Sequence, residues 1–174
     1  MLTEPCIEKK LKKLLLITSS GGGGLLQTAN AKEQEAIANN PGIQIVRRDL
    51  LKDWLWKPLG DFFINFWNQA QRKGDIPAQL ICVYGQFLVD IFLHPTIFVY
   101  VLYTLFTEDV DHIIDTQPLG TSAIVKALRI FNRQRGKQVR LEKVLVDLPT
   151  KKATHFFRPI KKLSSKNRRL VKLT

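Results

Sequence analysis

The sequence predicts an α/β domain of the Rossmann-like kind, with three layers and a mostly parallel sheet between helices. Three observations indicate it: short apolar runs alternate with helical patterns, the first run enters a glycine-rich turn, and polar loops follow the runs. The length of 174 residues suits one domain with a proper core. Hydrophobic residues make up 45% and charged residues 24%, which is typical of a globular chain and not of a disordered one.

The first βαβ unit is visible near the amino terminus. Residues 14–17 are all apolar and precede Thr18-Ser19-Ser20 and four glycines, the pattern of a buried parallel strand that enters a tight turn. Residues 25–39, rich in Ala, Glu, Gln and Lys, predict a helix that ends at Asn-Asn-Pro-Gly. Residues 43–46 predict the second strand. The crossover between the two strands should be right-handed.

The middle of the chain is aromatic and apolar. Residues 54–73 carry Trp and Phe at helical spacings, and residues 76–106 are largely apolar. The longest uncharged run, residues 91–107, has 17 residues and falls short of the roughly 20 that a membrane-spanning helix needs. Pro77, Gly85, Asp90 and Pro95 interrupt the apolar stretch, and we expect buried helices there, with a helix break at His94. An exposed membrane-contacting surface is the alternative, and a spanning segment is the least favoured.

Regular α/β character returns in the second half. Residues 112–114 predict a strand, residues 117–122 a loop, and residues 123–133 a helix that ends at Gly136. Residues 139–146 predict one more strand.

Three loops should lie together at one edge of this sheet: residues 19–24, 116–122 and 147–155. Ligands of open parallel sheets bind at the carboxyl ends of the strands. Successive glycines let backbone N–H groups approach a ligand, and a helix amino terminus favours negative charge. A tight turn without a ligand remains the alternative for the glycines. The candidate acceptor- or phosphate-binding residues are Ser20, Gly21, Gly22, Gly23, Gly24, Gln117, Thr121, Thr150 and His155.

The net charge of +12 is concentrated at the carboxyl end. Residues 151–174 hold nine Lys or Arg and no acidic residue, so residues 1–150 carry only +3. Such a segment suits phosphate groups, although a solvated end or a linker has the same composition. No nucleic-acid reader motif accompanies it, so nucleic acid is not the expected partner. The candidate membrane or anion contacts are Trp54, Trp56, Lys161, Lys162, Arg168 and Arg169.

The cysteines and the amino terminus bear on the compartment. Cys6 and Cys82 lie far apart, which predicts neither a metal site nor a disulfide framework. The apolar run after the charged start is too short for the core of a signal peptide. We therefore expect a cytoplasmic protein, with peripheral membrane association, and no metal.

Four blocks together carry a family resemblance. They are Leu-Ile-Thr-Ser-Ser-Gly-Gly-Gly-Gly at 16–24, Val-Arg-Arg-Asp-Leu at 46–50, Asp-His-Ile-Ile-Asp-Thr-Gln-Pro-Leu at 111–119 and Val-Leu-Val-Asp-Leu-Pro-Thr at 144–150. Over residues 14–157 the chain resembles the amino-terminal domain of monogalactosyldiacylglycerol synthases and processive diacylglycerol glucosyltransferases. In these GT-B enzymes two Rossmann-like domains face each other. The first receives the lipid acceptor and the second holds a UDP-sugar.

The resemblance implies an organisation and an activity. Residues 1–160 would form the acceptor-side domain, and residues 161–174 a basic tail or the start of a linker to a donor-binding domain in a longer protein. The enzyme would transfer a hexose from a UDP-sugar to a membrane lipid or a related acceptor. The UDP-sugar would be a donor substrate, and no cofactor is implied.

The positions that depart from the family pattern concern catalysis. Three positions where the family has histidine carry Leu25, Gln117 and Lys152 instead, and neither leucine nor glutamine can act as a general base. Asp147, after the last predicted strand, is then the candidate catalytic base. His155 is either a displaced imidazole or a packing residue.

Two further expectations follow from these departures. Asp115 is a second candidate base unless its side chain points back into the fold. If no base remains, the chain would be a catalytically inactive glycosyltransferase-like module that binds an anionic membrane surface or a protein partner.

Overall fold

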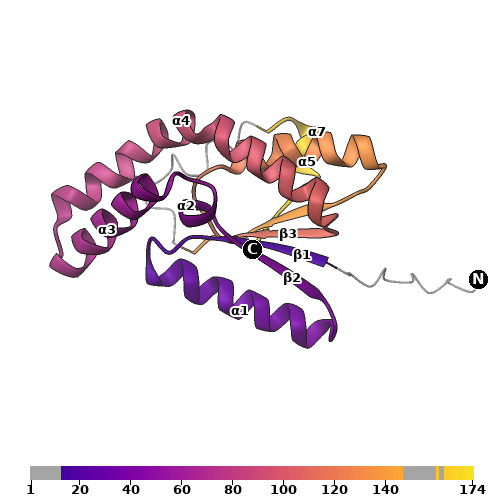
Figure 1. The fold of residues 1–174 in the computed structure, drawn as a ribbon, viewed down its shortest axis with the longest axis horizontal. Coiled ribbons are helices and arrows are strands. Elements are labelled where there is room, and N and C mark those ends of the chain that lie inside the picture. Colours follow the sequence, from indigo (N-terminus) through magenta and orange to yellow (C-terminus); the bar gives the residue numbers. More distant parts are fainter. Residues whose placement is uncertain (1–12, 147–159, 161–162) are drawn as a thin grey trace, which may run out of the picture.

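The computed structural model describes residues 13–146, residue 160 and residues 163–174 (Figure 1). Within them five strands form one parallel sheet in the order β2-β1-β3-β4-β5, flanked by helices, which confirms the predicted Rossmann-like three-layer class. The strands are β1 (Lys13–Thr18), β2 (Gln44–Asp49), β3 (His112–Asp115), β4 (Arg140–Lys143) and β5 (Val171–Leu173). The helices are α1 (Gly23–Asn39), α2 (Leu50–Asp53), α3 (Lys57–Lys73), α4 (Ile76–Glu108), α5 (Thr121–Arg135) and α7 (Ser165–Arg168).

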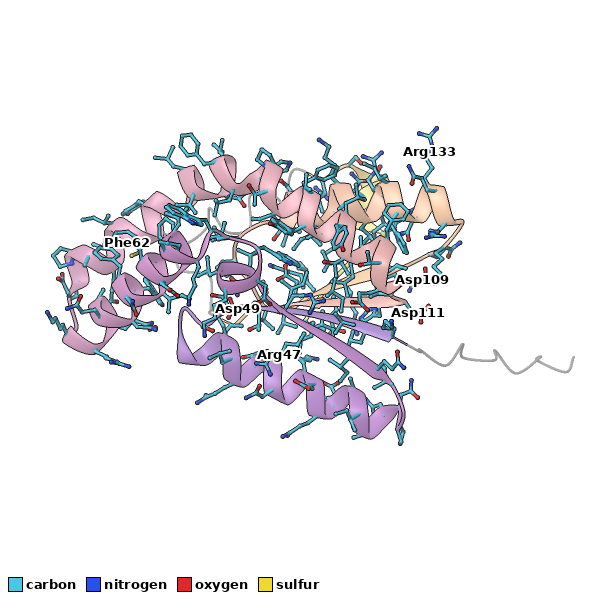
Figure 2. The ribbon with its side chains drawn as sticks, in the orientation of Figure 1. Arg47, Asp49, Phe62, Asp109, Asp111 and Arg133 are labelled. Atoms are coloured by element: carbon cyan, nitrogen blue, oxygen red, sulfur yellow. The ribbon has the colours of Figure 1, made fainter. Side chains whose placement is uncertain are left out.

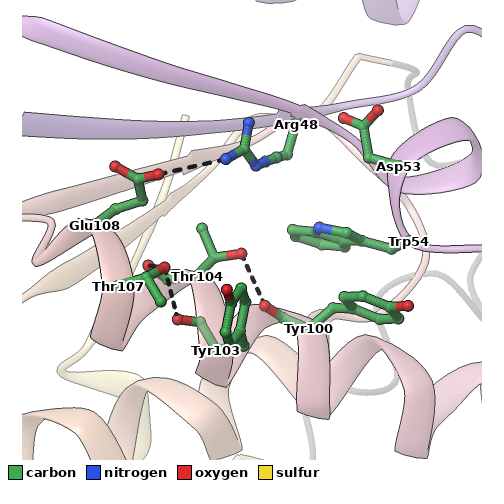
Figure 3. Close-up of a pocket in the computed structure, with 8 residues that line it drawn as sticks. All are labelled: Arg48, Asp53, Trp54, Tyr100, Tyr103, Thr104, Thr107 and Glu108. Atoms are coloured by element: carbon green, nitrogen blue, oxygen red, sulfur yellow. Dashed lines mark hydrogen bonds and ion pairs between the residues drawn. The ribbon is translucent and has the colours of Figure 1, made fainter.

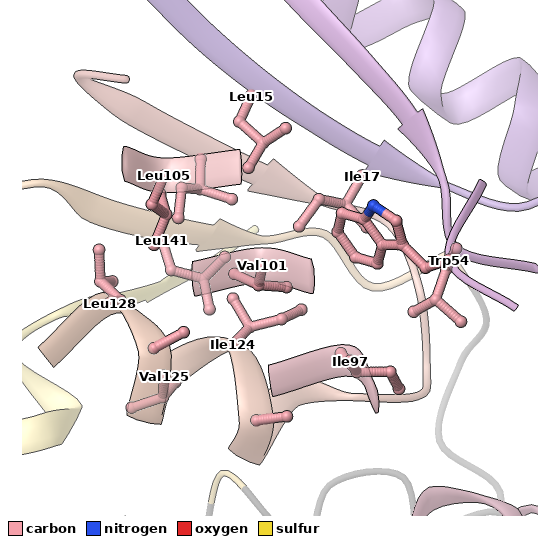
Figure 4. Close-up of a cluster of buried hydrophobic side chains, with 14 of the residues drawn as sticks. Leu15, Ile17, Trp54, Ile97, Val101, Leu105, Ile124, Val125, Leu128 and Leu141 are labelled. Atoms are coloured by element: carbon pink, nitrogen blue, oxygen red, sulfur yellow. The ribbon is translucent and has the colours of Figure 1, made fainter. Parts of the chain in front are cut away.

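The apolar run of β1 supplies both cores, because alternate side chains of a strand point to opposite faces. Leu15 and Ile17 pack under α4 and α5 in the larger core (Figure 4), whereas Leu14 and Leu16 face α1. All four side chains are at most 1% exposed. Figure 1 shows the same division, with α1 on one face of the sheet and α4 and α5 on the other.

The strand order creates a topological switch point between β1 and β3. The chain leaves β1 for β2 on one side, then returns through α2, α3 and α4 to β3 on the other side. In doubly wound sheets of this order, ligands bind in the crevice at the carboxyl ends of the two strands that flank the switch. The loops after β1 and β3 therefore meet where a ligand is expected.

The prediction of separate helices with a break at His94 is wrong, because α4 is one helix of 33 residues. Pro77 occupies the first turn, where its missing N–H costs nothing, and Asp75 caps the helix by accepting from the Ala78 N–H at 3.0 Å. Pro95 lies inside the helix. Asp90, which interrupts the apolar stretch, accepts a hydrogen bond from the Gly120 N–H at 2.7 Å.

The expected burial of α4 is correct only for one side of the helix. Ile97, Val101 and Leu105 are fully buried against the sheet (Figure 4). The segment Leu88–Glu108 is long and apolar enough to cross a membrane, yet only 28% of it is buried inside the molecule. Much of this apolar helix is therefore open to its surroundings.

Helices α3 and α4 form an antiparallel pair that extends past the carboxyl ends of the strands (Figure 1). Gly74, in the left-handed conformation, ends α3 and allows the reversal into α4. Gly60 lets α3 touch α2, since a Cβ atom there would lie 2.1 Å from the Leu51 carbonyl oxygen. The projecting pair thus stands at the same edge as the candidate loops.

The carboxyl-terminal segment adds a strand to the sheet. Within residues 161–174, expected to be a basic tail or a linker, Val171–Leu173 pairs in parallel with β4 as β5. Strand β4 is shorter than predicted and ends at Lys143.

Candidate functional site at the carboxyl edge of the sheet

The glycine loop connects β1 to α1 at this edge. The Ser19 hydroxyl accepts from the Gly21 N–H at 2.9 Å, and the Ser20 hydroxyl donates to the Asp49 carboxylate at the end of β2. Gly22, with φ of 115°, precedes α1 and supplies no side-chain cap, and the first turn holds no acidic residue. The first N–H groups of α1 are thus left without a capping side chain, as suits an anionic ligand.

An aromatic side chain of α3 borders this loop. A Cβ atom added to Gly22 would lie 3.3 Å from Nε1 of Trp67, so the indole packs directly on the glycine backbone. A Cβ atom at Gly23 would meet nothing within 4 Å, which leaves space beside the start of α1. The loop motif gave no sign of Trp67; the helical spacing of aromatic residues in 54–73 was the available signal.

The loop after β3 is buried, and some of its hydrogen-bonding groups have no partner within the described residues. The Thr116 hydroxyl donates to the Ile17 carbonyl at 3.3 Å, which fixes this loop beside β1. Gln117 is 3% exposed and Thr121 is fully buried, yet Gln117 Nε2 and Thr121 Oγ1 have no hydrogen-bond partner within the described residues. Since buried polar groups are nearly always paired, these two atoms are open to a partner that the described chain does not supply.

Helix α4 holds the start of α5 against this loop. Besides the bond from the Gly120 N–H to Asp90, the Ser122 hydroxyl and His94 Nδ1 lie 3.1 Å apart. Gly120 has φ of 78°, a conformation that glycine adopts without strain. The loop after β3 is therefore anchored on both sides, by β1 and by α4.

The prediction that Asp115 could act as a base is wrong. Its carboxylate is fully buried, accepts from Lys143 Nζ at 2.6 Å and also accepts from the Gln117 N–H at 2.8 Å. Burial raises the pKa of Asp115, and the ammonium of Lys143 opposes that rise. A carboxylate enclosed in this way braces the end of β3 and faces no acceptor.

The other predicted residues divide into described and undescribed ones. Leu25 is half-buried in the first turn of α1, and its carbonyl accepts from the Thr18 hydroxyl at 3.4 Å. Four others fall outside the described residues: Asp147, Thr150, Lys152 and His155. Among the described residues no group of three or more His, Cys, Asp or Glu side chains could hold a metal ion.

Among the predicted membrane or anion contacts, the prediction for Trp54 is wrong. Its indole is 3% exposed and belongs to the core under α4 (Figure 4), because α2 turns it inward. Trp56, two residues later, is 76% exposed. Arg168 and Arg169 are exposed, and Lys161 and Lys162 lie outside the described residues.

A second depression, of about 420 Å³, lies between β2, α2 and the last turns of α4 (Figure 3). No sequence motif indicated it. Arg48 and Glu108 form an ion pair across it at 3.4 Å, and Glu108 also pairs with Lys13 at 3.2 Å, so these two lining charges are already paired. The lining residues are Arg48, Asp53, Trp54, Tyr100, Tyr103, Thr104, Thr107 and Glu108.

No protein-family model, curated protein or solved structure matches the chain, so the function is inferred from the geometry of the carboxyl edge.

Proposed function

We propose that this chain is the acceptor-side domain of a glycosyltransferase that moves a hexose from a UDP-sugar to a diacylglycerol-type lipid at the cytoplasmic face of a membrane. The observation that carries the proposal is the contact between the glycine loop at the switch point and Trp67 of the projecting helix pair. This contact joins the glycine loop, which suits phosphate or hydroxyl oxygens, to the apolar surface of the helix pair, which suits acyl chains.

The polar half of this site suits a sugar nucleotide or the head of an acceptor. The N–H groups at the start of α1 have no side-chain cap, and the open space beside Gly23 gives a ligand room to approach them. The unpaired donors of Gln117 and Thr121 on the neighbouring loop suit hydroxyl or phosphate oxygens.

The apolar half is the exposed side of α3. Leu59, Phe62 and Phe66 recur at helical spacing and are exposed, and the rings of Phe62 and Phe66 stack with centroids 6.0 Å apart. Exposed apolar surface of this kind marks a site for lipid or protein. A lipid whose chains lie along α3 would bring its hydroxyl to the glycine loop past Trp67.

The chemistry needs one base. In the proposed step the acceptor hydroxyl oxygen bonds to the anomeric carbon, the bond from that carbon to the UDP oxygen breaks, and the hydroxyl proton passes to Asp147. Asp147 lies outside the described residues; it follows β4 in sequence, and β4 neighbours β3 in the sheet. Asp115 is unsuitable, because Lys143 occupies its carboxylate.

The test is sugar transfer by the protein at its full natural length. UDP-glucose or UDP-galactose is supplied with vesicles that contain dioleoylglycerol, and glycolipid is measured by mass spectrometry. Gly23→Val places a side chain in the open space at the start of α1, where an added Cβ atom meets nothing within 4 Å, and should lower transfer by at least about tenfold. Ala38→Val, exposed near the other end of α1, is the control and should keep full activity. Absence of transfer by the folded wild-type protein with either donor contradicts the proposal.

A second candidate is an inactive module of the same fold that binds a membrane surface or a partner. The pairing of Asp115 with Lys143 favours it, because the described loops then present no free base beside Leu25 and Gln117. Calorimetry with UDP-glucose separates the two candidates. The enzyme should bind the nucleotide at its full natural length, and the inactive module should not.

A further inference from the structure

One side of α4 is a continuous apolar stripe that faces away from the molecule. Its members recur every three or four residues over a stretch of 23 residues, a length of about 33 Å. Apart from the exposed Pro95 in its middle, each is between 56% and 77% exposed. The stripe consists of Ile81, Tyr84, Leu88, Phe92, Pro95, Val99 and Tyr103.

The stripe contains no charged residue, and it lies on a different side of α4 from the residues that pack in the core. The core side of the same helix is occupied by Ile97, Val101 and Leu105, all fully buried. Asp90, the acidic residue of α4 within the span of the stripe, accepts a hydrogen bond from the Gly120 N–H at the start of α5. Monomeric proteins rarely expose a contiguous apolar strip of this length without a binding partner.

A row of basic side chains borders the stripe. Lys126, Arg129 and Arg133 are exposed at spacings of three and four residues on α5, and α5 contains no acidic residue. Helix α5 packs beside α4, where Lys126 Nζ lies 5.0 Å from the centre of the Phe98 ring. Arg133 points away from the sheet (Figure 2), on the outer side of the layer that α4 and α5 share.

We propose that the α4 stripe and the α5 basic row form one docking face that lies flat on an anionic lipid bilayer. The inference rests on the proposed function, which supplies the membrane lipid, and it names the surface of the protein that contacts the membrane. Apolar and aromatic side chains enter the boundary between head groups and acyl chains, the tyrosines keep their hydroxyls in the head-group layer, and the basic row pairs with lipid phosphates. This placement lays α4 of the projecting α3–α4 pair along the membrane, and its partner α3 borders the glycine loop through Trp67.

The charges favour a bilayer over a second copy of the chain as the occupant. A second copy docked through the same face would bring another basic row and, from α5, no carboxylate to pair with it. An anionic surface is complementary to the apolar stripe and to the basic row together.

Vesicle co-sedimentation of the full-length protein, without nucleotide, tests the docking face. Binding to vesicles with about 30% phosphatidylglycerol should exceed binding to phosphatidylcholine vesicles and should fall as NaCl rises from about 0.1 to 0.5 M. Phe92→Ser/Val99→Ser should weaken binding by about tenfold. Arg129→Glu/Arg133→Glu should weaken it to a similar extent and remove the salt dependence.

Two controls match these variants. Arg140→Glu/Lys172→Glu changes the net charge by the same amount on the α1 side of the sheet, where Glu142 pairs with Lys32. Ile37→Ser removes an exposed apolar side chain from α1. Both should bind vesicles as the wild type does. Light scattering adds a check on oligomeric state: a dimer that Phe92→Ser/Val99→Ser dissociates, with vesicle binding unchanged, overturns the proposal in favour of a second copy.

Equal binding to neutral and anionic vesicles, or equal losses in variants and controls, also overturns it. Because no sugar donor is present, a failure of sugar transfer leaves this result unaffected. Conversely, if the protein transfers sugar to a soluble acceptor but binds no vesicles, the transferase proposal holds and the docking-face proposal is wrong.

Discussion

At the scale of single residues, the ion pair between Asp115 and Lys143 explains how a carboxylate can be buried at the end of β3. Neither side chain has access to solvent beyond 3%, and the two lie 2.6 Å apart. Loss of one partner of a buried pair is costly because it leaves the other charge unpaired, whereas loss of both can be nearly neutral.

Lys143→Met should therefore destabilise the protein by about 3 kcal/mol. The cause is the unpaired Asp115 carboxylate, which must then take up a proton or remain charged in the interior. Asp115→Asn/Lys143→Met should recover most of the loss. Urea unfolding of the two variants and the wild type at pH 7 measures both effects, and a single variant as stable as the wild type would show that the pair does not hold β3.

His112, at the start of β3, gives stability a pH dependence. Burial lowers the pKa of His112 below its ordinary value of 6.5, and Glu142, 3.6 Å away, only partly offsets the effect. Below pH 6.5 the unfolded chain binds a proton that the folded chain does not, so the free energy of unfolding should decrease as the pH falls from there. The free energy of unfolding of the His112→Gln variant should decrease less over the same pH range. Urea titrations at pH 7.5, 6.5 and 5.5 measure the difference, and parallel curves would contradict it.

At the scale of elements, the approach of α3 to α2 depends on one glycine. A Cβ atom at Gly60 would overlap the Leu51 carbonyl, so Gly60→Ala must separate the two helices. We expect a loss of about 2 kcal/mol or more. Gly85→Ala, inside α4 with nothing within 4 Å, is the matched control and should gain up to about 1 kcal/mol of stability. Thermal unfolding distinguishes the two, and equal midpoints for both variants would show that the α2–α3 contact is not close.

The same elements show what local sequence patterns can predict. Strand β1 and helix α1 were found because an apolar run, four glycines and an Asn-Asn-Pro-Gly stop are local signals. The helix break expected at His94 is wrong because tertiary contacts outweigh local preference. Asp90 binds α5, and buried side chains after Pro95 hold the second half of the helix on the sheet.

At the scale of the whole molecule, the strand order and the outward faces depend on contacts between distant segments. Two of the three predicted loops lie at carboxyl ends of strands and meet there, and the third, residues 147–155, lies outside the described residues. The burial of Trp54 and the exposure of Phe92 could not be inferred, because each depends on which helix covers which face. Trp67 was not recognised as a wall of the site for the same reason.

The most direct test of the proposed lipid-acceptor site is photo-crosslinking of the full-length protein to a diazirine-labelled diacylglycerol in vesicles, with the labelled peptides located by mass spectrometry. Labels should concentrate in the peptides that hold Trp67 and the glycine loop, and Gly23→Val should remove the label from the loop while leaving the label on α3. Label confined to the exposed face of α1, or no label above that of a soluble diazirine control, would contradict the account.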